Sequence, residues 1–575
     1  MKKSNLTGWM VVPVVLAMLV SACEKFLDVP PKDLLTPEQH FRDKFDADAA
    51  VRGIYGKLIY LAEQYVILNE LRADLMDVTD NADIFLREIN LHQVSEDNPY
   101  ADPTLFYSVI NDCNDVLHNF NIMLNELKIS EEEYVQRYSD IATLRSWLYL
   151  QLVIHYGEVP YITEPVDRVD DLGKITDGRY PLLGIEVMID TLIGVMESLP
   201  YLDLYTDPSF RTIIDGFDTR IMFIDKEIFL GDLYLWRGDY LAATTTYKNV
   251  MVRDIEQNFY DSYKLCYGEP YTLPHFNSGY VRYYWEDIHS VLNNWPFMFY
   301  SPQNADYYCE WTWALYFHET YPPENPFLEL FSKEPGSYLL KPAISVMEDW
   351  ESQIQQNSFK KDFRGEDGSY RMIDGDPVIT KYISGYDPLY PFEKGGQWHL
   401  WRTGSLHLRF IEAANRDDQY KLAAALMNNG IRTTYGVPGA VDVTYLERTN
   451  LAFPYDFDGR YANPNQIPAG TRGEWHRNIG VRGRVYLQAR EIPAADSLLK
   501  IEDFVLDEGA LELAFEGHRW GDLVRIAIRR NDPSILADRI YRKLDMAGYP
   551  EASSVQSKLM ERDNWFLPLK MSQDK

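Results

Sequence analysis

The feature that most constrains the fold is a pair of helical segments between Phe223 and Val250. Small and aromatic residues recur in it near the spacing of tetratricopeptide repeats. They are Gly231, Tyr234, Gly238, Ala243 and Tyr247. The small residues let two helices touch, and the aromatic rings fill the groove between them. Because each pair leaves an apolar face that only a neighbouring pair can bury, we predict an all-α fold, a tetratricopeptide-like solenoid of helix pairs.

Other segments extend this stack, and one long segment interrupts it. Asp46 to Tyr55 has apolar residues at helical spacing, and Ile141 to His155 is amphipathic and ends before a glycine and a proline. Trp401 to Ile431 predicts a second, weaker helix–turn–helix. From about 256 to 400 helical periodicity fails, and Pro, Gly, Asn and aromatic residues dominate. We therefore expect long irregular loop insertions, where binding residues usually lie.

The N-terminus has the pattern of a secretory signal peptide. Lys2 and Lys3 precede an apolar run from Trp9 to Val20, and small residues precede Cys23. The run is shorter than the ~20 residues that a membrane-spanning helix needs. Val20-Ser21-Ala22-Cys23 also resembles a bacterial lipobox, in which the cysteine becomes the acylated N-terminus. We therefore predict a lipoprotein that is anchored to a membrane through acyl chains, palmitate among them, on Cys23.

These signals predict the domain organisation. We expect a signal peptide over 1–22, a lipidated extended tether over 23–40, a helical region over 41–255, a loop-rich ligand-binding insertion over 256–400 and a second helical region over 401–575. Prolines at 30, 31 and 37 disfavour helix in the tether. The region from 41 to 575 is expected to form one integrated domain.

Charge and cysteine content exclude some classes of protein. The formal net charge is −31, which argues against nucleic acid and anionic lipid as partners because both need clustered cations. Beyond Cys23 the chain has Cys113, Cys266 and Cys309. An odd number of thiols cannot all pair within one chain, so we expect no disulfide framework.

Aromatic residues crowd the insertion between Tyr280 and Phe317. Their spacing fits neither a helix nor a strand, so no single element could bury them all. An aromatic ring matches the apolar C–H face of a sugar, while packing in the core is the alternative for each ring taken singly. The candidate ligand-binding residues are Trp285, Trp295, Trp311, Trp313, Tyr283, Tyr284, Tyr307 and Tyr308.

A second candidate lies between Asp74 and Tyr100. Asp74, Asp77, Asp80 and Asp83 recur every third residue, but no EF-hand pattern accompanies them. Helix capping and a solvated surface explain such aspartates without calcium. If the aromatic segment is not the site, the acids of this loop, with its asparagines, are the next candidates to bind hydroxyl groups. The asparagines are Asn81, Asn90 and Asn98.

Motifs for catalysis are missing from the sequence. It has no His-Glu-x-x-His, Gly-x-Ser-x-Gly, Cys-x-x-Cys or phosphate-binding glycine loop. A glycosidase needs only two carboxylates, and Glu269 has the most enzyme-like context, yet spacing identifies no partner for it. We therefore expect no catalytic residues and no cofactor or metal.

The stretch from Leu511 to Arg525, LELAFEGHRWGDLVR, alternates apolar and charged residues at helical spacing. Glu516 and Arg519, like Asp522 and Arg525, stand three residues apart, so both ion pairs are expected to close on one helix face. The stretch resembles the ELAFEGxRWxDLxR motif of the SusD/RagB family of outer-membrane lipoproteins. Four other places carry the resemblance: the lipobox, FLDVPP with LTPEQHF, LRSWLYLQLVIHYGEVPYI and the closing FLPL.

The resemblance implies a surface-exposed, lipid-anchored outer-membrane protein that binds an oligosaccharide or polysaccharide. It would act without catalysis and deliver the glycan to a SusC-like TonB-dependent transporter, closing over the barrel as a lid. Some members of the family carry calcium. Two alternatives remain open: a peptide-binding member of the RagB kind and a secreted glycoside hydrolase.

The lipobox generates a prediction about the anchor. Cys23→Ala is expected to leave the precursor uncleaved or to release the protein from the membrane fraction, because several acyl chains hold a protein stably at a bilayer. Lipid labelling of fractionated cells measures this. Unchanged labelling in the variant would contradict the assignment of Cys23.

Overall fold

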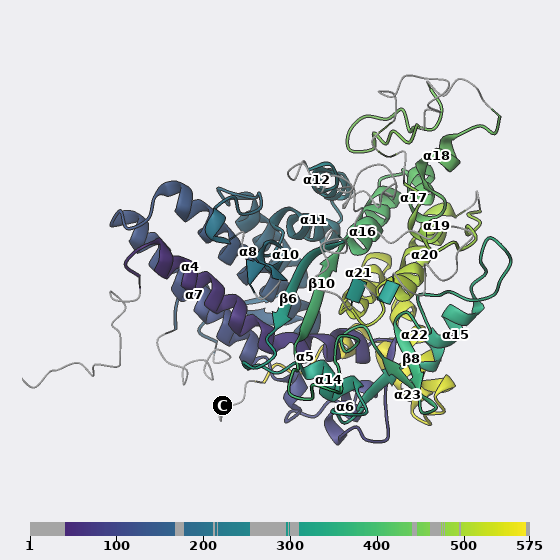
Figure 1. Ribbon diagram of the computed structural model, residues 1–575, viewed down its shortest axis with the longest axis horizontal. Helices are drawn as coiled ribbons and strands as arrows, with labels where there is room; N and C mark the ends of the chain where they lie inside the picture. The colour runs from purple at the N-terminus through teal and green to yellow at the C-terminus, as the bar shows by residue number, and fades with distance from the viewer. Residues whose placement is uncertain are drawn as a thin grey trace, which may run out of the picture.

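The structure is a computed structural model, and it describes residues 41–166, 178–210, 213–214, 217–253, 295–296, 298–299, 310–439, 445–460, 473, 475, 478–493 and 496–570. Figure 1 shows a helical protein with a few short strands near its centre. The predicted all-α, tetratricopeptide-like class is confirmed. Among the described residues, no helix is both long enough and apolar enough to cross a membrane.

The N-terminal half consists of helices with short 3-10 and π segments between them. The helices are α4 (Lys44–Leu58), α5 (Ala62–Val66), α6 (Ile84–Asn90), α7 (Thr104–Asn125), α8 (Glu131–Tyr156), α10 (Ile185–Glu197), α11 (Lys226–Arg237) and α12 (Tyr240–Val252). The short segments are η1 (Ile59–Leu61), the π-helical η2 (Ile67–Leu71), η3 (Pro99–Ala101), η4 (Pro208–Phe210) and η5 (Thr219–Met222). As predicted, α8 ends at a glycine, Gly157, whose φ of 78° few other residues adopt.

The C-terminal half repeats the helical pattern after two short helices in the insertion. These elements are α14 (Pro326–Phe331), α15 (Ile344–Ser352), α16 (Thr403–Arg416), α17 (Tyr420–Met427), α18 (Gly430–Tyr435), α19 (Val481–Arg484), α20 (Ser497–Glu512), α21 (Arg519–Arg530), α22 (Ser534–Met546), α23 (Ala552–Leu559) and η8 (Arg562–Trp565). Both predicted helix pairs are present, α11 with α12 and α16 with α17.

Close contact explains the small residues in the first pair. A Cβ atom on Gly231 would lie 2.5 Å from Cε1 of Tyr247, which is too close for any other residue. The same tyrosine donates a hydrogen bond to Asp232 at 2.7 Å. The interpretation that small residues here let paired helices touch is therefore confirmed.

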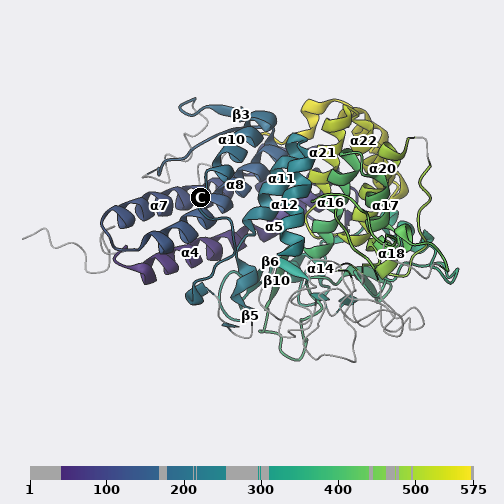
Figure 2. The same cartoon turned by 90° about the horizontal axis from the view of Figure 1, so that it is seen from above.

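Neighbouring helices form a continuous stack. Contacts run from α7 to α8, α10, α11, α12 and α16, and on to α20, α21, α22 and α23. Seen from above (Figure 2), α7 and α4 lie at one end and α20 and α22 at the other. This is the arrangement expected of a solenoid, in which each unit buries the face of the next.

The strands form small antiparallel pairs. They are β1 (Met76–Val78) with β7 (Leu340–Pro342), β2 (Glu158–Pro160) with β3 (Leu182–Gly184), β4 (Ile213–Ile214) with β5 (Phe217–Asp218), β8 (Tyr370–Ile373) with β9 (Asp376–Ile379), and β6 (Trp311–Phe317) with β10 (Gly396–Arg402). The β6–β10 pair matters most for the insertion, because β10 continues directly into α16 and so fixes the insertion to the solenoid.

The C-terminal motif differs from the single helix that its periodicity predicts. Helix α20 ends at Glu512 and α21 begins at Arg519, and the turn between them has φ values of 74° at Phe515 and 84° at Gly517. Asp522 and Arg525 pair at 2.8 Å as predicted. The predicted Glu516–Arg519 pair is wrong, because the turn separates the two residues and each has a buried partner elsewhere.

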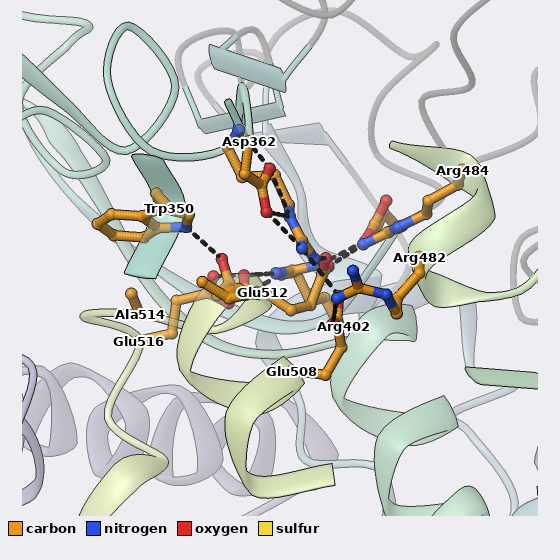
Figure 3. Close-up of polar contacts among 12 residues, drawn as sticks. Trp350, Asp362, Arg402, Arg482, Arg484, Glu508, Glu512, Ala514 and Glu516 are labelled. Atoms are coloured by element: carbon orange, nitrogen blue, oxygen red, sulfur yellow. Dashed lines mark hydrogen bonds and ion pairs between the residues drawn. The ribbon is translucent and has the colours of Figure 1, made fainter. Parts of the chain in front are cut away.

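Glutamates of this motif lie in a buried network of ion pairs (Figure 3). Glu516 accepts from Arg402 at 2.8 Å and from Lys381 at 2.7 Å, while Glu512 accepts from Arg402 at 2.6 Å. Arg364 joins Glu512 at 2.7 Å to Glu508 at 2.8 Å. The side chains are almost fully buried, so each charge depends on its partners.

Arg519 connects this motif to the N-terminal half of the chain. Its Nε and Nη2 donate to the two carboxylate oxygens of Asp74 at 2.6 and 2.7 Å. Arg519→Ala is expected to lower the free energy of unfolding by about 3–5 kcal/mol, because it leaves a buried carboxylate without its partner. Urea denaturation measures this. Arg42→Ala is the control, since Arg42 pairs with Asp46 on the surface, where solvent screens the ion pair and little change is expected.

Buried glutamates generate a pH prediction. Burial alone would raise the pKa of Glu508, but the charges of Arg364 and Arg482 lower it to about 2. The folded protein then binds fewer protons than the unfolded chain between pH 2 and about 4.3, so stability is full above that window and is lost as the pH falls through it.

We expect Glu508→Gln to make the free energy of unfolding less steep with pH in that window, by up to about 1.4 kcal/mol per pH unit. Urea titrations at several pH values measure the slope. Glu96→Gln, at an exposed side chain, should keep the wild-type slope. A wild-type slope in Glu508→Gln would show that another group controls acid unfolding.

Candidate functional site

The structure places three of the proposed ligand-binding tryptophans in the core. The exposed fractions are 1% for Trp295, 4% for Trp311 and 0% for Trp313. Trp313 packs against Trp147 with ring centroids 5.0 Å apart and against Trp401 at 4.8 Å. These three rings show the core packing that was the alternative for each of them, so none can stack on a ligand at the surface.

Trp311 and Trp295 show why sequence alone could not separate the two roles. Trp311 stacks on His399, 4.1 Å away on the paired strand β10, and its indole N–H donates to the carbonyl of Met298. Trp295 lies beside the cations of Arg402, Arg484 and Lys381. The other candidates lie outside the described residues. They are Trp285, Tyr283, Tyr284, Tyr307 and Tyr308.

The acidic loop is divided between core and surface. Asp74 and Asp77 are buried and hold Arg519 and Asn90, while Asp80 and Asp83 are exposed. Over the part of the chain that the structure describes, no cluster of histidine, cysteine, aspartate or glutamate could hold a metal ion.

Exposed aromatic rings instead gather on two neighbouring loops of the insertion, residues 318–325 and 385–395. Tyr321 is 68% exposed, Tyr390 56% and Phe392 87%. The loops follow β6 and precede β10, and the Glu324–Lys394 ion pair at 2.7 Å joins them. The Tyr321 ring also contacts that of His318, 4.6 Å away. We call these two loops the loop surface.

Acidic and tyrosine side chains lie around α5 and around α14, the helix that directly follows the first loop of the loop surface. Burial raises the pKa of Glu63, and the charges of Glu329 on α14 and Asp83 at the start of α6 raise it further. Burial also raises the pKa of Tyr100, which lies near the same carboxylates. Contacts between α5 and α14 keep these groups together, and Figure 1 shows the two helices side by side below β6 and β10.

This combination can bind a polyhydroxylated ligand. Aromatic faces offer stacking surfaces for C–H groups, and carboxylates accept hydrogen bonds from hydroxyl groups. Its support is rigid, because Asn325 donates hydrogen bonds from one loop to the carbonyls of Tyr382 and Gly395 at 3.3 Å. The loop surface is thus held in place by the Asn325 side chain and the Glu324–Lys394 ion pair rather than by the rings themselves.

The rings of the loop surface were not among the predicted ligand-binding residues. They stand among prolines and glycines, in TYPPENP and YDPLYPFEKGG, where a turn-rich segment leaves side chains outside regular elements. This turn signal was present in the sequence. The dense aromatic cluster just before it was the stronger signal. For the described rings of that cluster, however, the high density of aromatic residues reflects packing in the core.

A cavity elsewhere in the fold is a second candidate for a ligand site, but it is too small for a sugar. Its volume is about 50 Å³, and Tyr65, Trp147, Trp236, Asp232 and Arg409 are among the residues that line it. Sites for small organic ligands usually measure about 300–1,000 Å³. The cavity has room for a few water molecules, and its charges already pair with one another, as Arg409 does with Asp232 at 3.2 Å.

The known proteins that this chain resembles are SusD-like proteins. A sequence model of the SusD family matches residues 302–570. SusD-like protein P2 of Formosa agariphila is 21% identical over 557 residues, which cover 92% of this chain and 91% of that protein.

Solved structures show the same fold. A SusD superfamily protein from Bacteroides vulgatus superposes with a TM-score of 0.55 at 11% identity, over 93% of this chain and 97% of that one. Surface glycan-binding protein A from Bacteroides uniformis gives a TM-score of 0.55 at 14% identity, over 91% and 95%.

The matched region contains the motif turn, the buried glutamate network and the loop surface, and the relatives cover nearly the whole chain. Together these matches support a SusD/RagB family protein.

Proposed function

We propose that the protein binds an oligosaccharide at the cell surface through the loop surface and the neighbouring acids, without breaking a bond. The observation that carries the proposal is the exposure of Tyr321, Tyr390 and Phe392 on loops that hydrogen bonds join to the rest of the fold. A monomeric protein gains no stability from exposing such rings together, and grouped exposed apolar residues usually mark a binding site.

Charge favours a neutral ligand with many hydroxyl groups. Burial raises the pKa of Glu63, and the nearby charges of Glu329 and Asp83 raise it further, so this group of carboxylates would repel an anionic ligand. Hydroxyl groups donate hydrogen bonds to such carboxylates without bringing further charge. Family membership supports the same ligand class, and one structural relative is named as a surface glycan-binding protein.

Anchoring and delivery complete the proposal. Acylated Cys23 would hold the protein on the outer membrane, and residues 23–40 would serve as the tether. A SusC-like TonB-dependent transporter would then receive the glycan. These steps rest on the lipobox and on the family. The aromatic residues outside the described part, Trp285 with Tyr283, Tyr284, Tyr307 and Tyr308, are proposed as further ligand contacts.

The loop surface generates a binding prediction. We expect Phe392→Ala and Tyr321→Ala each to weaken the complex with a bound glycan about thirtyfold, equal to about 2 kcal/mol, because binding energy concentrates in a few aromatic anchors. Glycan and peptide arrays would first identify the ligand, and titration calorimetry would then measure Kd. Phe45→Ala is the matched control, since this ring is 69% exposed at the start of α4, away from the loop surface.

A thermal melt must accompany each titration. Unchanged affinity in folded Tyr321→Ala, Tyr390→Ala and Phe392→Ala variants would remove the loop surface as the site. A peptide ligand on the array would replace the glycan proposal with the peptide-binding alternative. A new reducing end after incubation with the ligand would identify a glycosidase, since a binding protein returns the oligosaccharide intact.

A further inference from the structure

Arg72 is a buried cation at the C-terminal end of η2. The side chain is 1% exposed, and its guanidinium lies over the ring of Trp520 at 4.0 Å from the centroid. Nη2 donates to the backbone carbonyl of Trp565. The remaining donors, Nε and Nη1, have no hydrogen-bond partner among the residues that the structure describes.

No carboxylate among the described residues pairs with Arg72. Other fully buried arginines differ in this respect, as Arg364 bonds to Asp362 and Glu512 and Arg402 bonds to Glu516. Leaving a guanidinium in the interior without a counter-charge costs several kcal/mol. Because Arg364 and Arg402 are neutralised by carboxylates, the Arg72 guanidinium stands out as a fully buried cation that lacks such a counter-charge among the described residues.

Neighbouring side chains add further unpartnered polar atoms. They are Nε1 of Trp520, Nε2 of His92 and both ring nitrogens of His155. His92 lies 5.7 Å from the Trp520 ring, and His155 is placed by its carbonyl, which accepts from Leu567 two residues beyond Trp565. Burial lowers the pKa of both histidines, and the nearby charge of Arg72 lowers it further.

We propose that a small inorganic anion of the chloride class binds beside the Arg72 guanidinium, accepting N–H groups of Arg72, Trp520 and the neighbouring histidines. Such an ion supplies the counter-charge that the chain itself does not. It also accepts several hydrogen bonds at once, which matches a group of side chains rich in donors. Buried polar atoms without partners are uncommon, and an unseen ion or water usually explains them. The net cation at Arg72 favours an ion over water.

This site is separate from the loop surface and its test does not depend on a glycan. The purified full-length protein is melted in sodium chloride and sodium gluconate mixtures of constant ionic strength. We expect the melting temperature to rise with chloride and reach a plateau, because an ion that binds only the folded state stabilises it by mass action. Crystals soaked in sodium bromide should show an anomalous peak beside Arg72.

Arg72→Met should abolish the chloride dependence. Arg52→Met is the matched control, because Arg52 also stacks on an aromatic ring, Phe210 at 5.4 Å, and donates to a carbonyl, but is exposed. Equal melting temperatures in the two salts, or water rather than bromide at Arg72, would overturn the proposal. If Arg72→Met does not fold, the bromide peak in the wild-type crystal decides.

Discussion

The side-chain carboxyl of Glu70 joins the N-terminal and C-terminal halves of the chain, and much of the structure depends on that contact. It accepts from the backbone N–H groups of Gly517 at 2.7 Å, His518 at 3.0 Å and Phe515 at 3.1 Å. These donors belong to the turn before α21 and would otherwise be buried without partners. A residue of the π-helical segment η2 thus caps a helix more than 440 residues away.

The turn that Glu70 caps also directs the charges around it. Because Phe515 and Gly517 have positive φ, Glu516 points to Arg402 and Lys381 while Arg519 points to Asp74. A Cβ atom on Gly517 would lie 2.1 Å from Cε1 of Tyr65, so the close approach requires glycine. The motif is therefore a structural junction that ties the strand β10, the insertion and the N-terminal helices together.

That junction fixes one end of the strand pair that carries the loop surface. Arg402 ends β10 and binds Glu512 and Glu516, so the strand that precedes α16 is fixed at its buried end. The opposite end of the β6–β10 pair carries the loops with Tyr321 and Phe392. A rigid strand pair between a charged core and an exposed loop lets the rings stay exposed without local disorder of their support, as a preformed site requires.

The sequence by itself determined the helix pairs, their stacking and the places where two helices come too close for any residue but glycine. Small and aromatic residues at fixed spacing specify such local helix contacts. The sequence predicted an irregular insertion over 256–400, whereas the described part of that segment contains the strands β6 to β9, the start of β10 and the helices α14 and α15. Only the tertiary structure decided which aromatic residues are exposed. Trp313 and Phe392 both lie in the aromatic-rich insertion, yet pairing with β10 and packing on Trp147 bury the first and leave the second outside. Burial depends on contacts between residues far apart in the chain, which local periodicity does not encode. The partners of Glu516 and Arg519 differed from their predicted pairing for the same reason.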